Sequence, residues 1–221
     1  MVRAVLTCGV FVTMLLPFFA SSASVGPVVD RTNREVRISA TVQPNAMSRP
    51  FGVKGHHAIV WRGGRARTWA LFVSDVSDHD VRAALDSLGA RRGENLTEDC
   101  WNARDDPQNP EPDKRVEGTP VDVFVEWPGS RRMALSEVIE EKGRPAPVLD
   151  FRYGGNERYQ KDFKSGCIVC LYSCPGGAVG NHAHPVRDYV RDGVVYTSAK
   201  DRLPKSGTKV TLILKPRLEE P

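Results

Sequence analysis

A group of cysteines in the last third of the chain most constrains how the chain can fold. The segment SGCIVCLYSCPGG, residues 165–177, contains Cys167, Cys170 and Cys174. A helix would align them on one stripe, but two β-branched residues separate the first pair, and the proline after Cys174 disfavours helical backbone. A strand would point Cys167 and Cys170 to opposite faces, because side chains alternate along it. We therefore predict a loop in which the three sulfurs converge.

The N-terminus has the pattern of a signal peptide over residues 1–23. Arg3 is followed by the apolar run AVLTCGVFVTMLLPFFA and then by SSAS, whose small residues suit a signal peptidase. This run is shorter than the roughly 20 apolar residues of a spanning helix, it contains Pro17, and no basic cluster follows it. We therefore expect Cys8 to be removed with the signal and residues 24–221 to be periplasmic or secreted. Thiols persist there only if they are paired, metal-bound or catalytic.

Length and charge limit the function classes further. The chain has 221 residues and a formal net charge of +4, and its basic and acidic residues alternate rather than forming runs. Nothing in this pattern resembles a nucleic-acid-binding face. Because no apolar stretch of similar length follows the signal, we expect no membrane span after signal cleavage. The mature length suits one sizeable core or two small ones.

Alternating apolar and polar residues predict a protein that consists mainly of strands. A tight hairpin turn at Gly63 and Gly64 should join two of them. The clearest helix spans residues 77–90, with Ser77 as its cap and Gly89 as its stop, and a shorter helical segment is expected near residues 135–143. Strands outnumber helices and are not regularly interleaved with them, so we expect an α+β single domain: a mainly antiparallel sheet with one or two short helices. The predicted strands are residues 34–43, 56–61, 68–73, 119–127 and 209–215.

The order of several segments resembles the YdjY family of exported bacterial proteins. These segments are GHHAIVW, VSDHDVRAALDSLGA, GTPVDVFVEW, LSEVI and CIVCLYSCPGGAVGN, and together they cover most of the mature chain. The resemblance implies a strand-rich domain over residues 24–221, with a histidine-containing segment and a short helix ending at Leu-Gly. It also implies a cysteine-rich loop near residues 165–185, of a kind sometimes described as ferredoxin-like. The family has no assigned activity, so the resemblance implies a fold and an exported location rather than a chemistry.

The cysteines allow three interpretations, and Cys100 has a part in two of them. An iron–sulfur cluster fits the C-x3-C-P ending of the bacterial ferredoxin motif, but Lys164 stands where the preceding cysteine would be, so Cys100 would have to supply a fourth thiolate. Zinc or copper would be held by the three clustered thiolates together with His182 or His184 from GNHAHPV. Disulfides would join Cys100 to one of the three cysteines and pair the other two.

These observations lead to one functional hypothesis and one alternative. We expect an exported, non-enzymatic protein whose site unites Cys100 with Cys167, Cys170 and Cys174, for metal or iron–sulfur binding and electron transfer with an envelope redox or metal partner. The alternative is a disulfide-stapled cell-envelope interaction module. No serine, histidine and carboxylate stand in a nucleophile-elbow setting, so a hydrolase is not expected. His56 and His57 at the start of a strand are interpreted as one inward and one outward residue, without chemistry.

Overall fold

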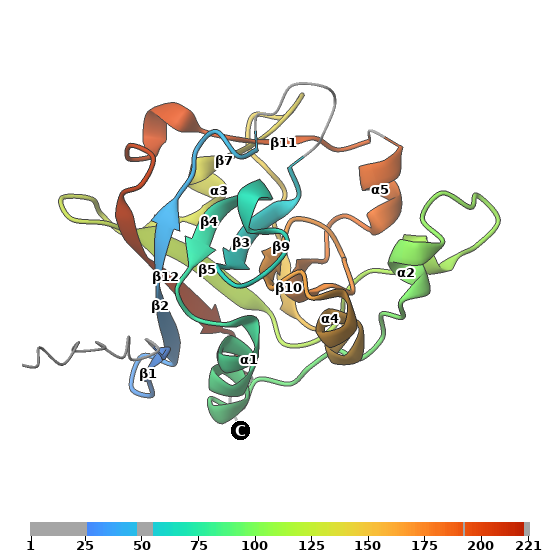
Figure 1. Cartoon of the computed structure of the whole chain (residues 1–221), viewed down its shortest axis with the longest axis horizontal. Helices are drawn as coiled ribbons and strands as arrows, with labels where there is room; N and C mark the ends of the chain where they lie inside the picture. The colour runs from blue at the N-terminus through green and yellow to red at the C-terminus, as the bar shows by residue number, and fades with distance from the viewer. Residues whose placement is uncertain (1–25, 48–54, 192, 219–221) are drawn as a thin grey trace, which may run out of the picture.

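A ten-stranded curled sheet forms most of the protein. The computed structural model describes residues 26–47, 55–191 and 193–218, so the predicted signal peptide, residues 1–23, lies outside the described residues. In chain order the strands of this sheet are β1 (Val28–Asp30), β2 (Glu35–Val42), β3 (His57–Trp61), β4 (Ala70–Ser74), β5 (Val121–Glu126), β6 (Met133–Ala134), β8 (Phe151–Tyr153), β9 (Cys167–Cys170), β10 (Gly177–Asn181) and β12 (Lys209–Pro216). Their spatial order is β6-β5-β12-β2-β4-β3-β9-β10-β8, with β1 beside β2 (Figure 1). A second sheet pairs β7 (Ile139–Glu141) with β11 (Tyr196–Ser198).

The strands with the clearest alternation form as predicted. In β2 the apolar set Val36, Ile38, Ala40 and Val42 is buried, with each member at most 2% exposed. β12 pairs antiparallel with both β2 and β5, so it is the central strand of this half of the sheet. The mainly antiparallel α+β architecture is therefore confirmed. Two pairs of neighbours, β3 with β4 and β9 with β10, are parallel, so the sheet is mixed.

The predicted hairpin between the strands now labelled β3 and β4 is wrong. His57 lies opposite Ala70 and Trp61 opposite Ser74, so the two strands run parallel, and the chain must cross back before β4 begins. Neither Gly63 nor Gly64 has the positive φ that a tight hairpin turn requires. A Cβ at Gly64 would lie 2.2 Å from the carbonyl oxygen of Ser165, so glycine is needed because two backbone segments touch there.

Helices are more numerous than the one or two expected, although most of them are short. The predicted helix is α1 (Asp78–Ser87), where the Ser77 side chain accepts a hydrogen bond from the Asp80 amide. Gly89 follows it with a φ of +89°. Other helices over the described residues are α2 (Asp99–Asn102), α3 (Leu135–Val138), α4 (Glu157–Phe163) and α5 (Val186–Val190), with 3-10 turns η1 (Arg67–Trp69), η2 (Glu111–Asp113) and η3 (Lys200–Arg202). Residues 102–118, which begin at the last residue of α2, contain the 3-10 turn η2.

The sheet curls until its ends approach each other. The Tyr153 amide at the end of β8 donates to the carbonyl of Thr119 at 2.8 Å, and Pro120 forms an isolated bridge with Arg152. β8 therefore lies beside the chain that enters β5. The main core fills the curl and includes the buried stripe of α1, with Val81 and Leu85 both at 0% exposed. Within the described ranges, no helix has the length and apolar character needed to cross a membrane.

Candidate metal centre

The first two cysteines of the cluster lie on a strand rather than in the predicted loop. β9 occupies an interior position of the sheet, between β3 and β10. Against β3 its register is irregular: Val60 lies opposite Cys167, Ile59 opposite Val169, and His57 opposite Cys170. A bulge of this kind inserts an extra residue and interrupts the strict alternation of side chains. For that reason Cys167 and Cys170 can lie on the same side of a strand, which regular alternation would forbid.

Three potential metal ligands gather at this irregular pairing. A ligand nitrogen of His57 and the sulfurs of Cys167 and Cys170 all lie within 4.8 Å of one another. The shortest measured approach is 3.3 Å, between His57 Nδ1 and Cys167 Sγ. The group is buried, with exposures of 9%, 1% and 0% in the same order. Burial, aided by the neighbouring imidazole of His56, holds the pKa of His57 well below its usual range, so this ring is a neutral donor at physiological pH.

Cys174 extends the group toward the surface. It lies in the turn between β9 and β10, is 8% exposed, and its side chain contacts that of Cys170. The pKa of Cys174 is raised well above its usual value, first by this contact and then by burial. Burial, followed by the contact with Cys167, also raises the pKa of Cys170. The three sulfurs therefore converge as predicted, and in the metal-free protein Cys170 and Cys174 are protonated thiols.

Cys100 is placed elsewhere. It lies on α2 and is buried in a small apolar cluster with Leu96 and Val116, whereas the other three cysteines share a different cluster. Its Sγ is 3.9 Å from Thr97 Oγ1 and from Glu111 Oε2. The four cysteines of the described residues are all free. The structure therefore differs from the expected four-cysteine site, because α2 turns Cys100 toward its own local neighbours.

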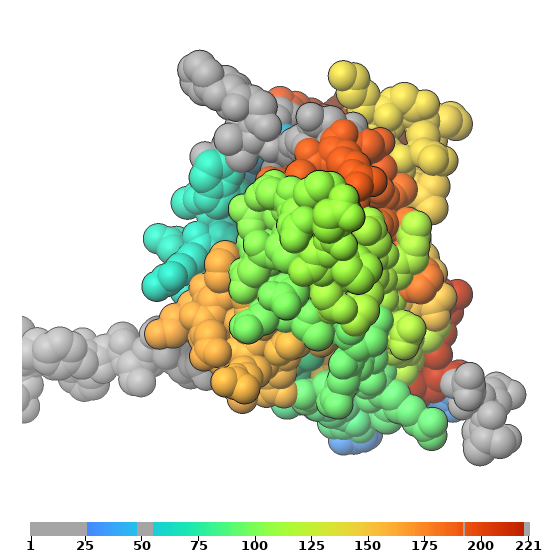
Figure 2. Space-filling view, turned by 90° about the vertical axis from the view of Figure 1, so that its right-hand side faces the viewer, coloured from blue at the N-terminus to red at the C-terminus, as the bar shows by residue number. Residues whose placement is uncertain are grey.

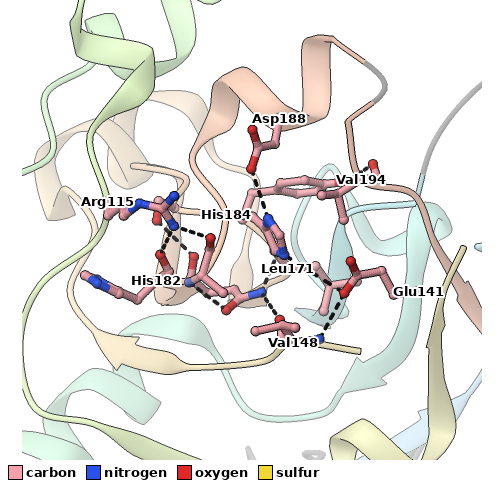
Figure 3. Close-up of polar contacts among 12 residues, drawn as sticks. Arg115, Glu141, Val148, Leu171, His182, His184, Asp188 and Val194 are labelled. Atoms are coloured by element: carbon pink, nitrogen blue, oxygen red, sulfur yellow. Dashed lines mark hydrogen bonds and ion pairs between the residues drawn. The ribbon is translucent and has the colours of Figure 1, made fainter. Parts of the chain in front are cut away.

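His182 and His184 are also held away from the cysteine group. β10 runs parallel to β9 with Gly180 opposite Cys170, so both histidines come after the paired region. His182 Nδ1 lies 2.7 Å from the carbonyl oxygen of Val116. His184 Nδ1 lies 2.9 Å from Asp188 Oδ2, and its Nε2 is 4.0 Å from Glu141 Oε2 (Figure 3). The imidazole beside the thiols is that of His57, which the sequence analysis interpreted as a strand residue without chemistry. It lies 110 positions from Cys167 along the chain.

A cavity of about 310 Å³ opens beside the metal-ligand group. His57 and Cys174 reach it, and most of the remaining wall consists of aromatic rings, including Trp101, Tyr159 and Phe163. Segment 62–69 in teal, α4 in amber and the green segment around α2 lie side by side on the face shown in Figure 2. Residues from all three of these segments line the cavity.

The profile of one protein family matches most of the chain. The profile of the YdjY domain matches residues 28–215, from β1 to the end of β12. The chain belongs to the YdjY family. Because the YdjY match spans the whole curled sheet, it includes His57, Cys167, Cys170 and Cys174.

A curated relative was also found. The Escherichia coli (strain K12) protein named Uncharacterized protein YdjY is 31% identical over 161 residues, which are 72% of this chain and 66% of the relative. The chain thus spans just under two thirds of the length of that YdjY protein. No solved structure matches the chain.

Proposed function

We propose that this YdjY-family protein is an exported protein that binds one divalent, zinc-like metal ion through His57, Cys167 and Cys170. The observation that carries the proposal is the mutual proximity of their three ligand atoms, all within 4.8 Å of one another. Zinc bonds of about 2.3 Å to sulfur and 2.0–2.1 Å to nitrogen place tetrahedral ligand atoms about 3.5 to 3.8 Å apart. The 3.3 Å between His57 Nδ1 and Cys167 Sγ is close to that range, so a small adjustment accommodates the ion.

The charge of the site favours a divalent ion. A neutral imidazole and two thiolates exactly offset a charge of 2+, and a neutral assembly is the least costly one to bury. Because burial raises the pKa of Cys170, binding requires this thiol to lose its proton, so each ion taken up releases at least one proton to solvent. An iron–sulfur cluster is less well matched, because such clusters take four cysteine thiolates and Cys100 packs in a separate cluster.

Cys174 supports the site from outside the ligand set. Its contact with Cys170 raises the pKa of Cys174 above that of an ordinary thiol, so Cys174 stays protonated and donates its S–H to the sulfur of Cys170. Donors of this kind orient a metal ligand and adjust its basicity. A bound ion would lie close to the aromatic cavity, because both His57 and Cys174 line it.

A disulfide between Cys170 and Cys174 is the second candidate, favoured by the contact between their side chains. Both thiols would lose a hydrogen to an oxidant of the exported compartment, and Cys170 would no longer be able to ligate a metal. The two states therefore exclude each other in one molecule.

Metal analysis of protein released from its own compartment tests both candidates. The proposal predicts one zinc-like ion per chain and, after replacement by Co²⁺, sulfur-to-cobalt absorption in the near ultraviolet with d–d bands in the visible. A metal-free protein with a mass two hydrogens below that of the reduced chain would instead establish the disulfide. If the signal is cleaved, the mature protein should begin near Ser24 and be released by osmotic shock, and recovery of the chain with an intact N-terminus in the membrane fraction would contradict this.

A further inference from the structure

The cavity beside the metal-ligand group has two aromatic walls from different elements. On α4, the rings of Tyr159 and Phe163 stack with centroids 5.3 Å apart and planes inclined by 15°. Opposite elements contribute His56, Trp101 and Tyr189, with His56 centroids 5.5 Å from Trp101 and 4.8 Å from Tyr189. All five of these residues line the same space. Aromatic walls attract flat rings, because offset-stacked and edge-to-face contacts add to the burial of apolar area.

One buried polar group in this wall has no partner. Tyr159 is 8% exposed, and its hydroxyl makes no hydrogen bond with any described residue. Nearly all buried polar groups in folded proteins are hydrogen-bonded, so an exception calls for an explanation. Burial, with a smaller effect from Cys174, raises the pKa of Tyr159 to about 12, so the group is a hydroxyl donor near neutral pH. A ligand that brings an oxygen acceptor into the cavity would satisfy it.

The same wall contains a cation without a counter-ion and an exposed ring. Arg65 lines the cavity from the crossing between β3 and β4, and within the described part of the chain it forms no ion pair. Phe163 is 46% exposed, although it is a large apolar side chain. Exposed apolar surface at the mouth of a cavity is typical of a binding site.

We propose that this cavity binds a planar aromatic carboxylate of one or two rings. The ring lies against Tyr159, Phe163 and Trp101, while the carboxylate accepts a hydrogen bond from the Tyr159 hydroxyl and is attracted by Arg65. The size is appropriate, because a cavity of about 150 Å³ holds benzene and this cavity has about twice that volume. The proposal does not depend on the metal ion, since none of these three rings and neither polar group belongs to the metal-ligand group.

Calorimetric titration with 2-naphthoate, and with 2-naphthamide as its uncharged counterpart, tests this proposal on metal-free and metal-loaded protein. We expect naphthoate to bind at micromolar to submillimolar concentration in both forms, to quench tryptophan fluorescence through Trp101, and to bind at least fivefold more tightly than the amide. Tyr159→Phe should weaken naphthoate binding about tenfold. Arg65→Met should weaken naphthoate and leave naphthamide unchanged, whereas Phe163→Ala should weaken both.

Arg62→Met is the matched control for Arg65→Met. Arg62 is exposed, belongs to the same crossing and pairs with Asp75 rather than lining the cavity, so its loss should leave both titrations unchanged. Absence of binding by both probes at millimolar concentration would overturn the proposal. So would naphthoate binding that is insensitive to Tyr159→Phe and Phe163→Ala in variants whose circular dichroism matches the parent. Equal binding of the two probes would refute the carboxylate specificity.

Discussion

Two buried histidines of this protein occupy opposite chemical environments. His184 is held by Asp188 at 2.9 Å and approached by Glu141 at 4.0 Å, so carboxylates flank both of its nitrogens. His57 has thiols as neighbours instead, with Cys167 Sγ 3.3 Å from its Nδ1. The carboxylates hold the imidazole of His184 in place as a structural group, whereas the neutral imidazole of His57 and the neighbouring thiols form a donor set for a zinc-like ion. The comparison shows that the neighbours of a histidine, rather than its burial or its distance from a cysteine in sequence, indicate its chemistry.

Removal of a thiolate should have the largest effect. Cys170→Ser replaces a thiolate ligand by a hydroxyl, and we expect metal affinity to fall about 1,000-fold. This is about 4 kcal/mol, or between a quarter and two fifths of the roughly 10–16 kcal/mol typical of structural zinc sites. Competition with a chromophoric zinc chelator measures this. Cys100→Ser is the control: because Cys100 packs with Leu96 and Val116, its replacement should lower stability by about 1–2 kcal/mol and leave metal affinity unchanged. Equal losses for the two variants would restore the four-cysteine site.

The pH dependence of metal affinity should be steep. Because burial raises the pKa of Cys170, that thiol is protonated at pH 7, and the low pKa of His57 keeps the imidazole from releasing a proton. Uptake of one ion thus displaces at least the proton of Cys170, and apparent affinity should rise at least about tenfold per unit between pH 6 and 8. Titration in buffers of different ionisation enthalpy counts the protons directly. A count of three would make Cys174 a ligand, and a count of zero would rule out thiolate coordination.

The two histidines can be compared directly by the same substitution. His57→Gln should weaken metal binding about 30-fold, because an amide oxygen is a poorer ligand than imidazole for this ion. His184→Gln should leave metal affinity unchanged and lower the free energy of unfolding by about 1–3 kcal/mol, since Asp188 and Glu141 lose their buried partner. Chelator competition and urea unfolding on both variants separate the effects. A loss of metal binding in His184→Gln would contradict the assignment.

The smallest effect concerns the hydrogen bond from Cys174. Cys174→Ala removes the donor to Cys170 and should weaken metal binding about tenfold, the lower end of what outer-shell partners contribute. Cys174→Ser keeps a donor at the same place and should restore most of that affinity. If both variants bound metal as the parent does, the Cys174 thiol would have no part in the site.

Much of the fold was predictable because its signals are local. The alternation of Val36, Ile38, Ala40 and Val42 determines which face of β2 is buried, and Ser77 with Gly89 delimits α1 through backbone groups a few positions away. The parallel pairing of β3 with β4 was missed because the sequence does not distinguish a glycine in a tight turn from a glycine that lets another backbone segment pass close by. Gly64 belongs to the second kind, because it contacts the backbone of Ser165, about 100 positions away along the chain.

The site was predictable only in part. Convergence of the three clustered sulfurs followed from their spacing. A strand at Cys167 and Cys170 was excluded on the assumption that side chains alternate regularly, whereas the pairing of β9 with β3 is irregular. Only the long-range pairing of β3 with β9 brings His57 to them, and no local pattern reports which distant strands become neighbours. His182 and His184 were favoured by sequence proximity alone, although each has a local partner that holds it elsewhere.

The interior position of β9 also affects how metal binding couples to the rest of the molecule. Neighbouring strands engage its backbone on both sides, so amide hydrogens there should exchange with solvent only when the sheet as a whole opens. The ligands are then already gathered before any ion arrives, and the ion has little chain to order. Unfolding separates His57 from Cys167 and Cys170, so the ion binds the folded protein much more tightly than the unfolded chain. Added metal should therefore slow hydrogen exchange at the most protected amides in proportion to its concentration, and it should raise the melting temperature. Release of the ion from the folded protein would instead require motion of the turn that contains Cys174, which follows the end of β9.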